Sequence, residues 1–187
     1  MNSRTMRLSA LAILALVLLA ATAVSCRSTV TNRVPLQQPF PTVRGRSLAG
    51  EEVRLPVVGE PILLLVGYAQ GAQFDADRWL FGLLQAGIPL RVIELPTIPG
   101  LFPRVISGTI DSGMQSGIPS EDWASVVPVY GSPARTIVEF TGNEQPRNIR
   151  VLLLDQEGRV HWFHDRGFSA SKLLELDRSV RTLLGGS

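Results

Sequence analysis

The chain has 187 residues, of which 45% are hydrophobic and 18% are charged, and its formal net charge at pH 7 is +2. These values predict a folded domain with a sizeable core, and they argue against nucleic-acid binding, which needs a strongly basic surface. Cys26 is the single cysteine, so an intrachain disulfide is excluded.

The first 25 residues have the layout of an export signal. Arg4 and Arg7 form a short basic start, and residues 8–24 are an apolar run with two polar interruptions. The run is short for the ~20 apolar residues that span a bilayer, so we expect cleavage, with an uncleaved transmembrane anchor as the alternative. Cleavage would remove two positive charges and leave a formally neutral chain of about 160 residues, enough for one domain.

Cys26 completes the sequence Ala-Val-Ser-Cys directly behind this run. The motif resembles a bacterial lipobox, in which the cysteine thiol receives diacylglycerol and the signal is cut just before it. The resemblance implies a lipoprotein held in the bilayer by several acyl chains such as palmitate, as stable anchoring requires. A buried or reactive free thiol is the alternative. Arg27 stands where some Gram-negative lipoproteins have an inner-membrane retention Asp, which favours the outer membrane.

Residues 26–41 contain three prolines and little hydrophobic periodicity, and they predict a tether between the membrane and a domain that begins at residue 42. Residues 40–56 predict a small β-hairpin with its turn near Gly50.

Residues 60–96 predict a β-α-β unit. The apolar run at 60–68 is typical of a strand buried on both faces, and 88–96 is a second strand. Between them, a helix at 75–87 has Asp75 as its expected N-cap and Gly87 at its left-handed end. The helical crossover makes the two strands parallel.

Residues 96–125 are rich in proline and glycine and predict an insertion that forms a cap or partner surface. Within it, residues 101–115 have a helical pattern and Ser120 begins a helical turn. A short strand at 126–131 and a short helix at 132–140 follow.

The C-terminal third predicts a β-hairpin at 148–165, from its turn residues and β-rich flanks. An amphipathic helix at 169–186 follows, capped by Ser169. Its apolar stripe consists of Leu173, Leu176, Val180 and Leu183.

This α/β order, a mixed sheet flanked by helices, resembles the thioredoxin fold, in particular its peroxiredoxin-like branch, over about residues 40–184. The ending VLLLDQEGRVHWFHDRGFSASKLLEL carries the resemblance most closely. In that superfamily the redox cysteine follows the first central strand, whereas the matching stretch here, GYAQGAQFDADRW, has none. The superfamily's cis-proline also lacks a counterpart, because Pro146 lies several residues too early. The resemblance therefore implies the fold without thiol–disulfide chemistry, which needs a thiolate.

A second resemblance is to the mitochondrial ATP-synthase assembly factor family, whose members are thioredoxin-like and can lack the redox pair. It implies an assembly or interaction role. The matching positions are Asp155, Arg159, Trp162, Gly167 and Phe168.

Both histidines lie in the stretch HWFHDRGFS. His164 beside Asp165 and Arg166 offers a candidate catalytic group, since histidine near a carboxylate can act as a general base or metal ligand. His161 and His164 are an odd number of residues apart, so on a strand they point to opposite faces. We therefore favour a structural role in which Arg166 pairs with Asp165.

Gln73, Asp75 and Arg78 occupy the superfamily's active-site position, at a helix N-terminus that favours anions. Asp75 and Asp77 would repel an anion and instead complement the helix dipole, so we expect a hydrogen-bonding surface for a protein partner.

The sequence thus predicts a membrane-anchored lipoprotein whose redox-inactive thioredoxin-like domain binds or assembles an envelope protein, with no cofactor, metal or nucleic acid. The alternative is an envelope enzyme of a non-thiol class, which would use His164 with Asp165, or Asp75 with Arg78, for acid–base chemistry.

Overall fold

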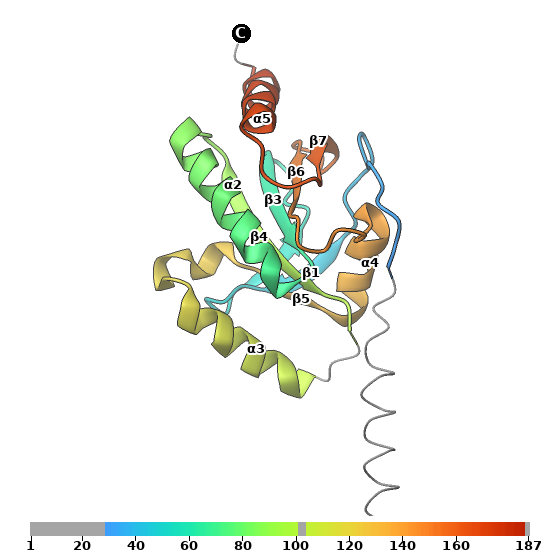
Figure 1. Cartoon of the computed structure of the whole chain (residues 1–187), viewed down its shortest axis with the longest axis vertical. Coiled ribbons are helices and arrows are strands. Elements are labelled where there is room, and N and C mark those ends of the chain that lie inside the picture. Colours follow the sequence, from blue (N-terminus) through green and yellow to red (C-terminus); the bar gives the residue numbers. More distant parts are fainter. Residues whose placement is uncertain (1–28, 101–103, 186–187) are drawn as a thin grey trace, which may run out of the picture.

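The computed structural model describes residues 29–100 and 104–185 (Figure 1). The predicted export signal and Cys26 lie outside these residues. Within the described part of the chain, no helix combines the length and apolar character needed to cross a membrane.

A mixed five-stranded sheet forms the centre of the domain, with strand order β5-β4-β3-β6-β7. The central strand, β3, pairs in parallel with β4 and antiparallel with β6. Helix α2 (Gln73–Ala86) connects the two parallel strands and ends at Gly87, whose φ of 60° is left-handed, so the predicted β-α-β unit is confirmed. The strands are β3 (Ile62–Gly67), β4 (Arg91–Ile98), β5 (Val129–Tyr130), β6 (Arg150–Leu154) and β7 (Val160–His164).

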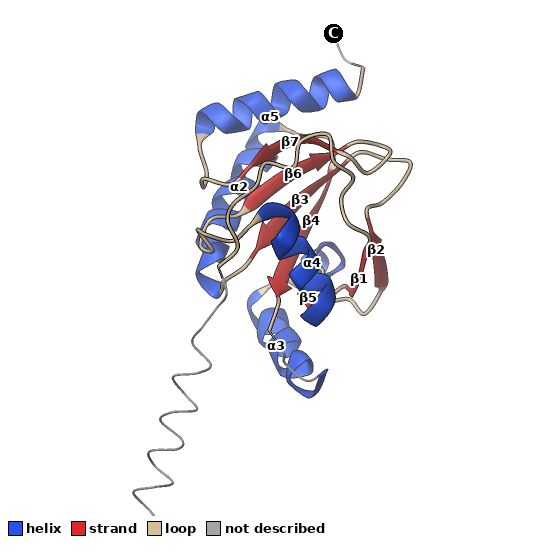
Figure 2. Cartoon of the chain, turned by 90° about the vertical axis from the view of Figure 1, so that its right-hand side faces the viewer, coloured by secondary structure: helices blue, strands red, loops and turns tan. Residues whose placement is uncertain are grey.

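Helices cover both faces of this sheet, α4 in front and α2 behind in Figure 2. Successive residues of β3 point to opposite faces. Leu63 and Leu65 join the core under α2 and α5 (Ala170–Leu183), while Ile62 and Leu64 join the core under α4 (Gly131–Thr141). Because both faces are covered, the strand is apolar throughout, as the sequence predicted.

The predicted N-terminal hairpin is confirmed as β1 (Val43–Arg46) and β2 (Glu52–Leu55), which form a separate antiparallel pair. The predicted C-terminal hairpin is confirmed by the antiparallel pairing of β6 and β7. Ser169 occupies the N-cap position of α5, as expected, but its side chain makes no capping hydrogen bond.

The insertion contains α3 (Arg104–Gly117) and the 3-10 turn η2 (Ser120–Ser125), so both predicted helical segments are confirmed. Side-chain hydrogen bonds fix it to the domain. The side-chain amide of Gln115 donates to the carbonyl of Leu48 at 2.8 Å, and the hydroxyl of Tyr130 donates to Asp111 at 2.5 Å.

The predicted tether is wrong for residues 30–40, which we name the N-terminal strap. The N–H of Arg33 donates to the carbonyl of Thr141 at 3.0 Å, and the N–H of Gln37 donates to the carbonyl of Val160 at 2.8 Å. Phe40 is buried and packs edge-on against Phe140, with ring centroids 5.6 Å apart. The strap shows no hydrophobic periodicity, because it contacts the domain through backbone groups and isolated side chains and not through one continuous apolar face. Within the described residues, the part packed on the domain therefore includes Val30 and does not begin at residue 42.

Candidate functional site

The candidate site lies where the central strands end, at the side of the sheet where β3 ends at Gly67 and β6 begins at Arg150. Since β6 is antiparallel to both β3 and β7, the end of β7 lies at the same edge. The turn η1 (Gln70–Ala72), the start of α2 and the loops at 142–149 and 165–169 surround it. We name this region the site edge.

Asp75 joins three of these segments. Its carboxylate accepts the N–H of Ile149 at 2.8 Å and the N–H of Phe168 at 2.7 Å. The residue is only 9% exposed. Ala72, and not Asp75, is the N-cap of α2, so the predicted capping role is wrong. The carboxylate instead satisfies two backbone donors from the chain before β6 and before α5, which makes Asp75 a structural residue of the site.

The other predicted binding residues on α2 are exposed. The Gln73 side-chain amide donates to Asp77 at 2.9 Å, one helical turn further on, and Arg78 is exposed to solvent. Gln73 and Arg78 can therefore contact a partner, whereas Asp75 cannot.

The two histidines lie apart, but they do not point to opposite faces as strand alternation predicted, because a register shift in the β6–β7 pairing interrupts the alternation and both rings lie on the side of α2 and α5. The ring of His164 lies 5.9 Å from Trp79 and 6.0 Å from Trp162, and its Nε2 is 2.9 Å from the carbonyl oxygen of Gly167. His161 instead lines a shallow pocket of about 280 Å³ beside α5.

Asp165 and Arg166 do not pair with each other, so that prediction is wrong. Asp165 accepts the side-chain amide of Asn32, from the N-terminal strap, at 2.9 Å. None of the four ion pairs among the described residues includes Arg166, which is exposed. Asp165 therefore pairs with Asn32 of the N-terminal strap, and not with Arg166 as the sequence predicted.

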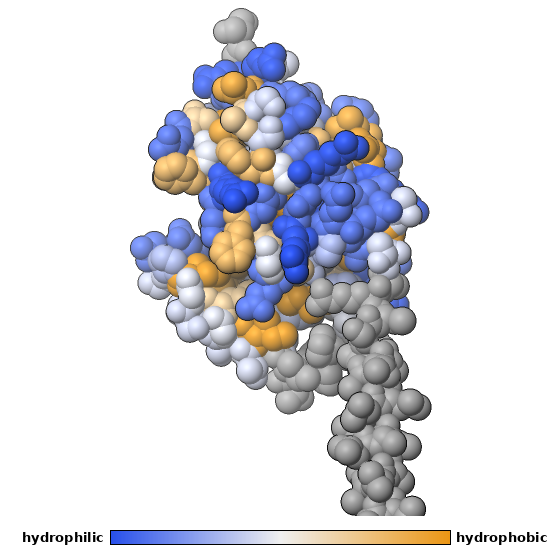
Figure 3. Space-filling model, in the orientation of Figure 1, coloured by the Kyte–Doolittle hydropathy of each residue, from blue (hydrophilic) through white to orange (hydrophobic). Residues whose placement is uncertain are grey.

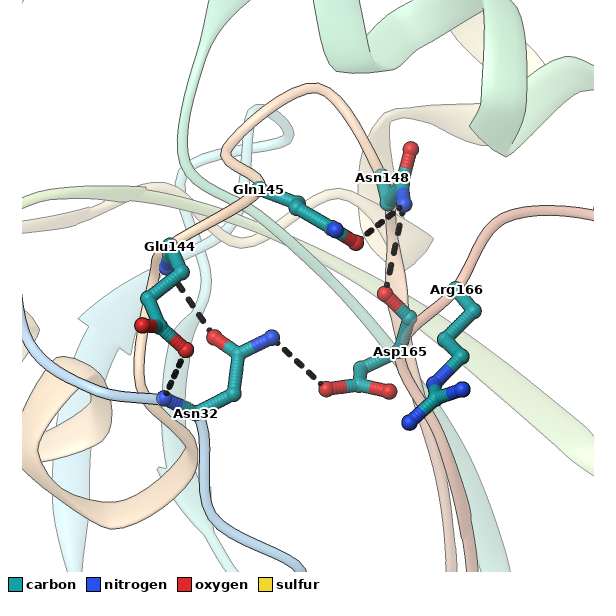
Figure 4. Close-up of a pocket in the computed structure, with 6 residues that line it drawn as sticks. All are labelled: Asn32, Glu144, Gln145, Asn148, Asp165 and Arg166. Atoms are coloured by element: carbon teal, nitrogen blue, oxygen red, sulfur yellow. Dashed lines mark hydrogen bonds between the residues drawn. The ribbon is translucent and has the colours of Figure 1, made fainter.

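An open, polar pocket of about 690 Å³ lies at the site edge (Figure 4). Asn32 organises it, because its backbone N–H donates to Glu144 at 2.8 Å and its side-chain oxygen accepts the N–H of Glu144 at 3.0 Å. Three segments far apart in the sequence thus meet around one asparagine. The pocket is lined by Asn32, Glu144, Gln145, Asn148, Asp165 and Arg166.

Arg150 lies fully buried beside this pocket. Its Nη1 donates to the carbonyls of Gln145 and Asn148, both at 2.7 Å, and its Nη2 donates to the side chain of Asn32 at 3.2 Å. The guanidinium lies 5.0 Å from the centre of the Tyr68 ring, a cation–π arrangement. Burial lowers the pKa of Arg150, and Tyr68 and Asp165 oppose that effect. Arg150 therefore fixes the loop that forms one wall of the pocket.

Sequence reasoning missed Asn32, Glu144, Gln145, Asn148 and Arg150. The sequence contains one signal for Arg150, which is a charged residue at the first position of an apolar strand. Asn32 left none, since it stands in a segment without periodicity.

The residues of the alternative enzyme do not converge. Asp165 lines the pocket, but His164 does not, and both carboxylate oxygens of Asp75 are occupied by backbone donors. Over residues 29–100 and 104–185, no group of three or more His, Cys, Asp or Glu is placed to hold a metal ion. The arrangement offers hydrogen-bonding groups and charges around an open pocket.

No protein family model and no curated protein matches the chain. Solved structures do match. A SCO1/SenC family lipoprotein from Bacillus anthracis str. Ames has a TM-score of 0.55 and 14% identity, over 82% of this chain and 99% of that chain. A peroxiredoxin-like protein from Aquifex aeolicus has a TM-score of 0.51 and 10% identity, over 81% and 91% of the two chains. The fold is thioredoxin-like. A further match, with a TM-score of 0.50 and 13% identity over 74% and 98% of the chains, is the exposed lipoprotein thioredoxin Etrx1 from Streptococcus pneumoniae strain TIGR4.

The thioredoxin-like domain has no cysteine at the site edge. The stretch that resembles the superfamily's redox segment forms the end of β3, η1 and the start of α2, and Cys26 is the chain's one cysteine. Asn148 and Ile149 stand directly before β6, where the superfamily has its cis-proline, and the cis peptide bond of the described chain is Leu55–Pro56. The fold is therefore present without the thiol that its redox members require.

Proposed function

We propose that this protein is a bacterial lipoprotein, anchored to a cell-envelope membrane through acyl chains on Cys26, whose thioredoxin-like domain is a redox-inactive binding or assembly module. The observation that carries this proposal is the site edge without a thiol. Thiolate is the nucleophile of thiol–disulfide exchange, and neither alanine nor glutamine can replace it. An acylated Cys26 has no free thiol either.

The lipid anchor is supported by the lipobox-like sequence behind an apolar run. Two proteins with the same fold, the SCO1/SenC family protein and Etrx1, are described as lipoproteins. Arg27 favours the outer membrane over the inner one.

A protein partner is supported by the outer face of α2. Phe74, Phe81 and Leu84 are 78%, 63% and 78% exposed, and their spacing places them on one side of the helix. Figure 3 shows apolar patches over α2 between hydrophilic ones. Exposed apolar groups next to free charges such as Arg78 are typical of interaction surfaces.

Cross-linking of the tagged protein in native membranes, followed by co-purification, tests this proposal. We expect one stoichiometric envelope protein, with its yield reduced several-fold by Phe81→Ala or Arg78→Ala. Arg54→Ala, an exposed change on β2, is the matched control and should leave the yield unchanged. Absence of a specific partner, or equal loss in the control, would contradict the proposal.

A further inference from the structure

The described chain begins at the site edge. The N–H of Val30 donates to the side chain of Asn143 at 2.7 Å, and the carbonyl of Val30 accepts the N–H of Asn143 at 2.9 Å. Two residues later, Asn32 binds Glu144 and Asp165. From there the N-terminal strap crosses to the opposite edge of the sheet, where the N–H of Phe40 donates to the carbonyl of Gly158. Val30 is thus held beside the candidate pocket.

Only four Cα–Cα steps lead from Cys26 to Val30. Fully extended, they reach at most about 14 Å. Strand β3, with six residues, is itself about 20 Å long. The link is therefore too short to place Cys26 at the opposite edge. If the apolar run were uncleaved and ended in the membrane at Val24, the chain from Val24 to Val30 could span at most about 22 Å. The site edge would then still be the part of the domain nearest to the membrane.

We propose that this short link holds the site edge against the phospholipid headgroups of the membrane. The inference rests on the proposed anchoring at Cys26, and it gives the candidate pocket a partner of defined chemistry. The pocket opens at the level of the headgroups, and the opposite edge, with the β6–β7 turn, points away from the bilayer.

The side chains at the site edge fit a zwitterionic headgroup layer. Arg33, Arg147 and Arg166 are exposed, and none belongs to an ion pair within the described chain. Free guanidinium groups bind phosphate through two parallel hydrogen bonds. The carboxylates of Glu144 and Asp165 line the pocket together with Arg166 and suit the ammonium group of such a lipid.

A lipid-quenching experiment tests this orientation on the full-length protein. Gln70→Cys places a thiol in η1 at the site edge, and Glu157→Cys places one in the β6–β7 turn at the opposite edge. Both native side chains are exposed. Each variant is labelled with the same fluorophore and reconstituted into phosphatidylethanolamine–phosphatidylglycerol vesicles that contain a headgroup-nitroxide lipid. We expect several-fold stronger quenching at position 70, and equal quenching at the two positions would overturn the inference.

Two controls separate the causes. Insertion of twelve Gly and Ser residues between Ser28 and Thr29 should remove most of the difference, and a difference that persists in full would contradict the short link as its origin. The intact mass of the membrane-extracted protein reports on the anchor independently. A mass that starts at Cys26 without acyl chains refutes the proposed anchoring, whereas an acylated protein with equal quenching refutes only the orientation.

Discussion

The central sheet and the site edge are built by different rules. In the sheet, the placement of apolar side chains follows from strand alternation, and apolar residues of similar volume could fill the same layer. At the site edge, polar groups from the N-terminal strap, α2 and two loops are joined by specific hydrogen bonds between distant segments. Asp75 and Arg150 stabilise this edge from within, whereas Gln73, Arg78 and Arg166 are exposed on it. The difference separates residues that shape the site from residues that are free to bind.

The largest loss of stability is expected when the buried cation, Arg150, is replaced. Arg150→Met keeps an unbranched apolar stem but leaves the carbonyls of Gln145 and Asn148 without their donor. Breaking such buried charged contacts costs about 3 kcal/mol or more. Urea unfolding measures this loss, and the exposed Arg54→Met should change the free energy of unfolding by less than about 0.5 kcal/mol. Equal effects of the two changes would refute the structural role of Arg150.

A smaller loss is expected for Asp75→Ala. The buried N–H of Ile149 and the partly buried N–H of Phe168 would lose their acceptor. Unsatisfied buried donors of this kind cost about 1–3 kcal/mol each. Thermal melting of Asp75→Ala beside the exposed Asp77→Ala checks the comparison. A variant of Asp75 as stable as the control would show that the carboxylate does not join the three segments.

A pH-dependent effect is expected at Glu94, on β4. Burial raises the pKa of Glu94 above its ordinary value of 4.5, and the negative charge of Asp77 raises it further. Because the folded-state pKa is the higher one, stability is lost as the pH rises through it. Glu94→Gln should therefore stabilise the domain at pH 7, by less than about 1 kcal/mol, and have no such benefit below pH 4.5. Melting curves across this pH range measure the effect, and a benefit independent of pH would contradict this explanation.

The smallest effect on stability is expected at the free cation. Arg166→Ala should change the free energy of unfolding by less than about 0.5 kcal/mol, since no ion pair within the described chain includes Arg166. A loss of stability comparable to that of Asp75→Ala would place Arg166 among the structural residues.

The sequence predicted the sheet, its helices and both hairpins because these elements depend on local patterns. The run Ile62–Gly67 and the left-handed Gly87 are signals that neighbouring residues alone produce. The site could not be predicted in the same way. Asn32 meets Asp165 across 133 positions of the chain, and Asp75 meets Phe168 across 93. Such contacts leave no periodicity, so the strap resembled a tether and Asp75 resembled a cap.

The central claim is that this thioredoxin-like domain works without thiol chemistry. The most direct measurement is a disulfide-reductase and peroxidase assay of the Cys26→Ser protein, with a redox-active thioredoxin-like protein as the positive control. We predict activity equal to the buffer blank, because no thiol remains in the chain. Disulfide reduction or peroxide turnover that survives Cys26→Ser would contradict the account.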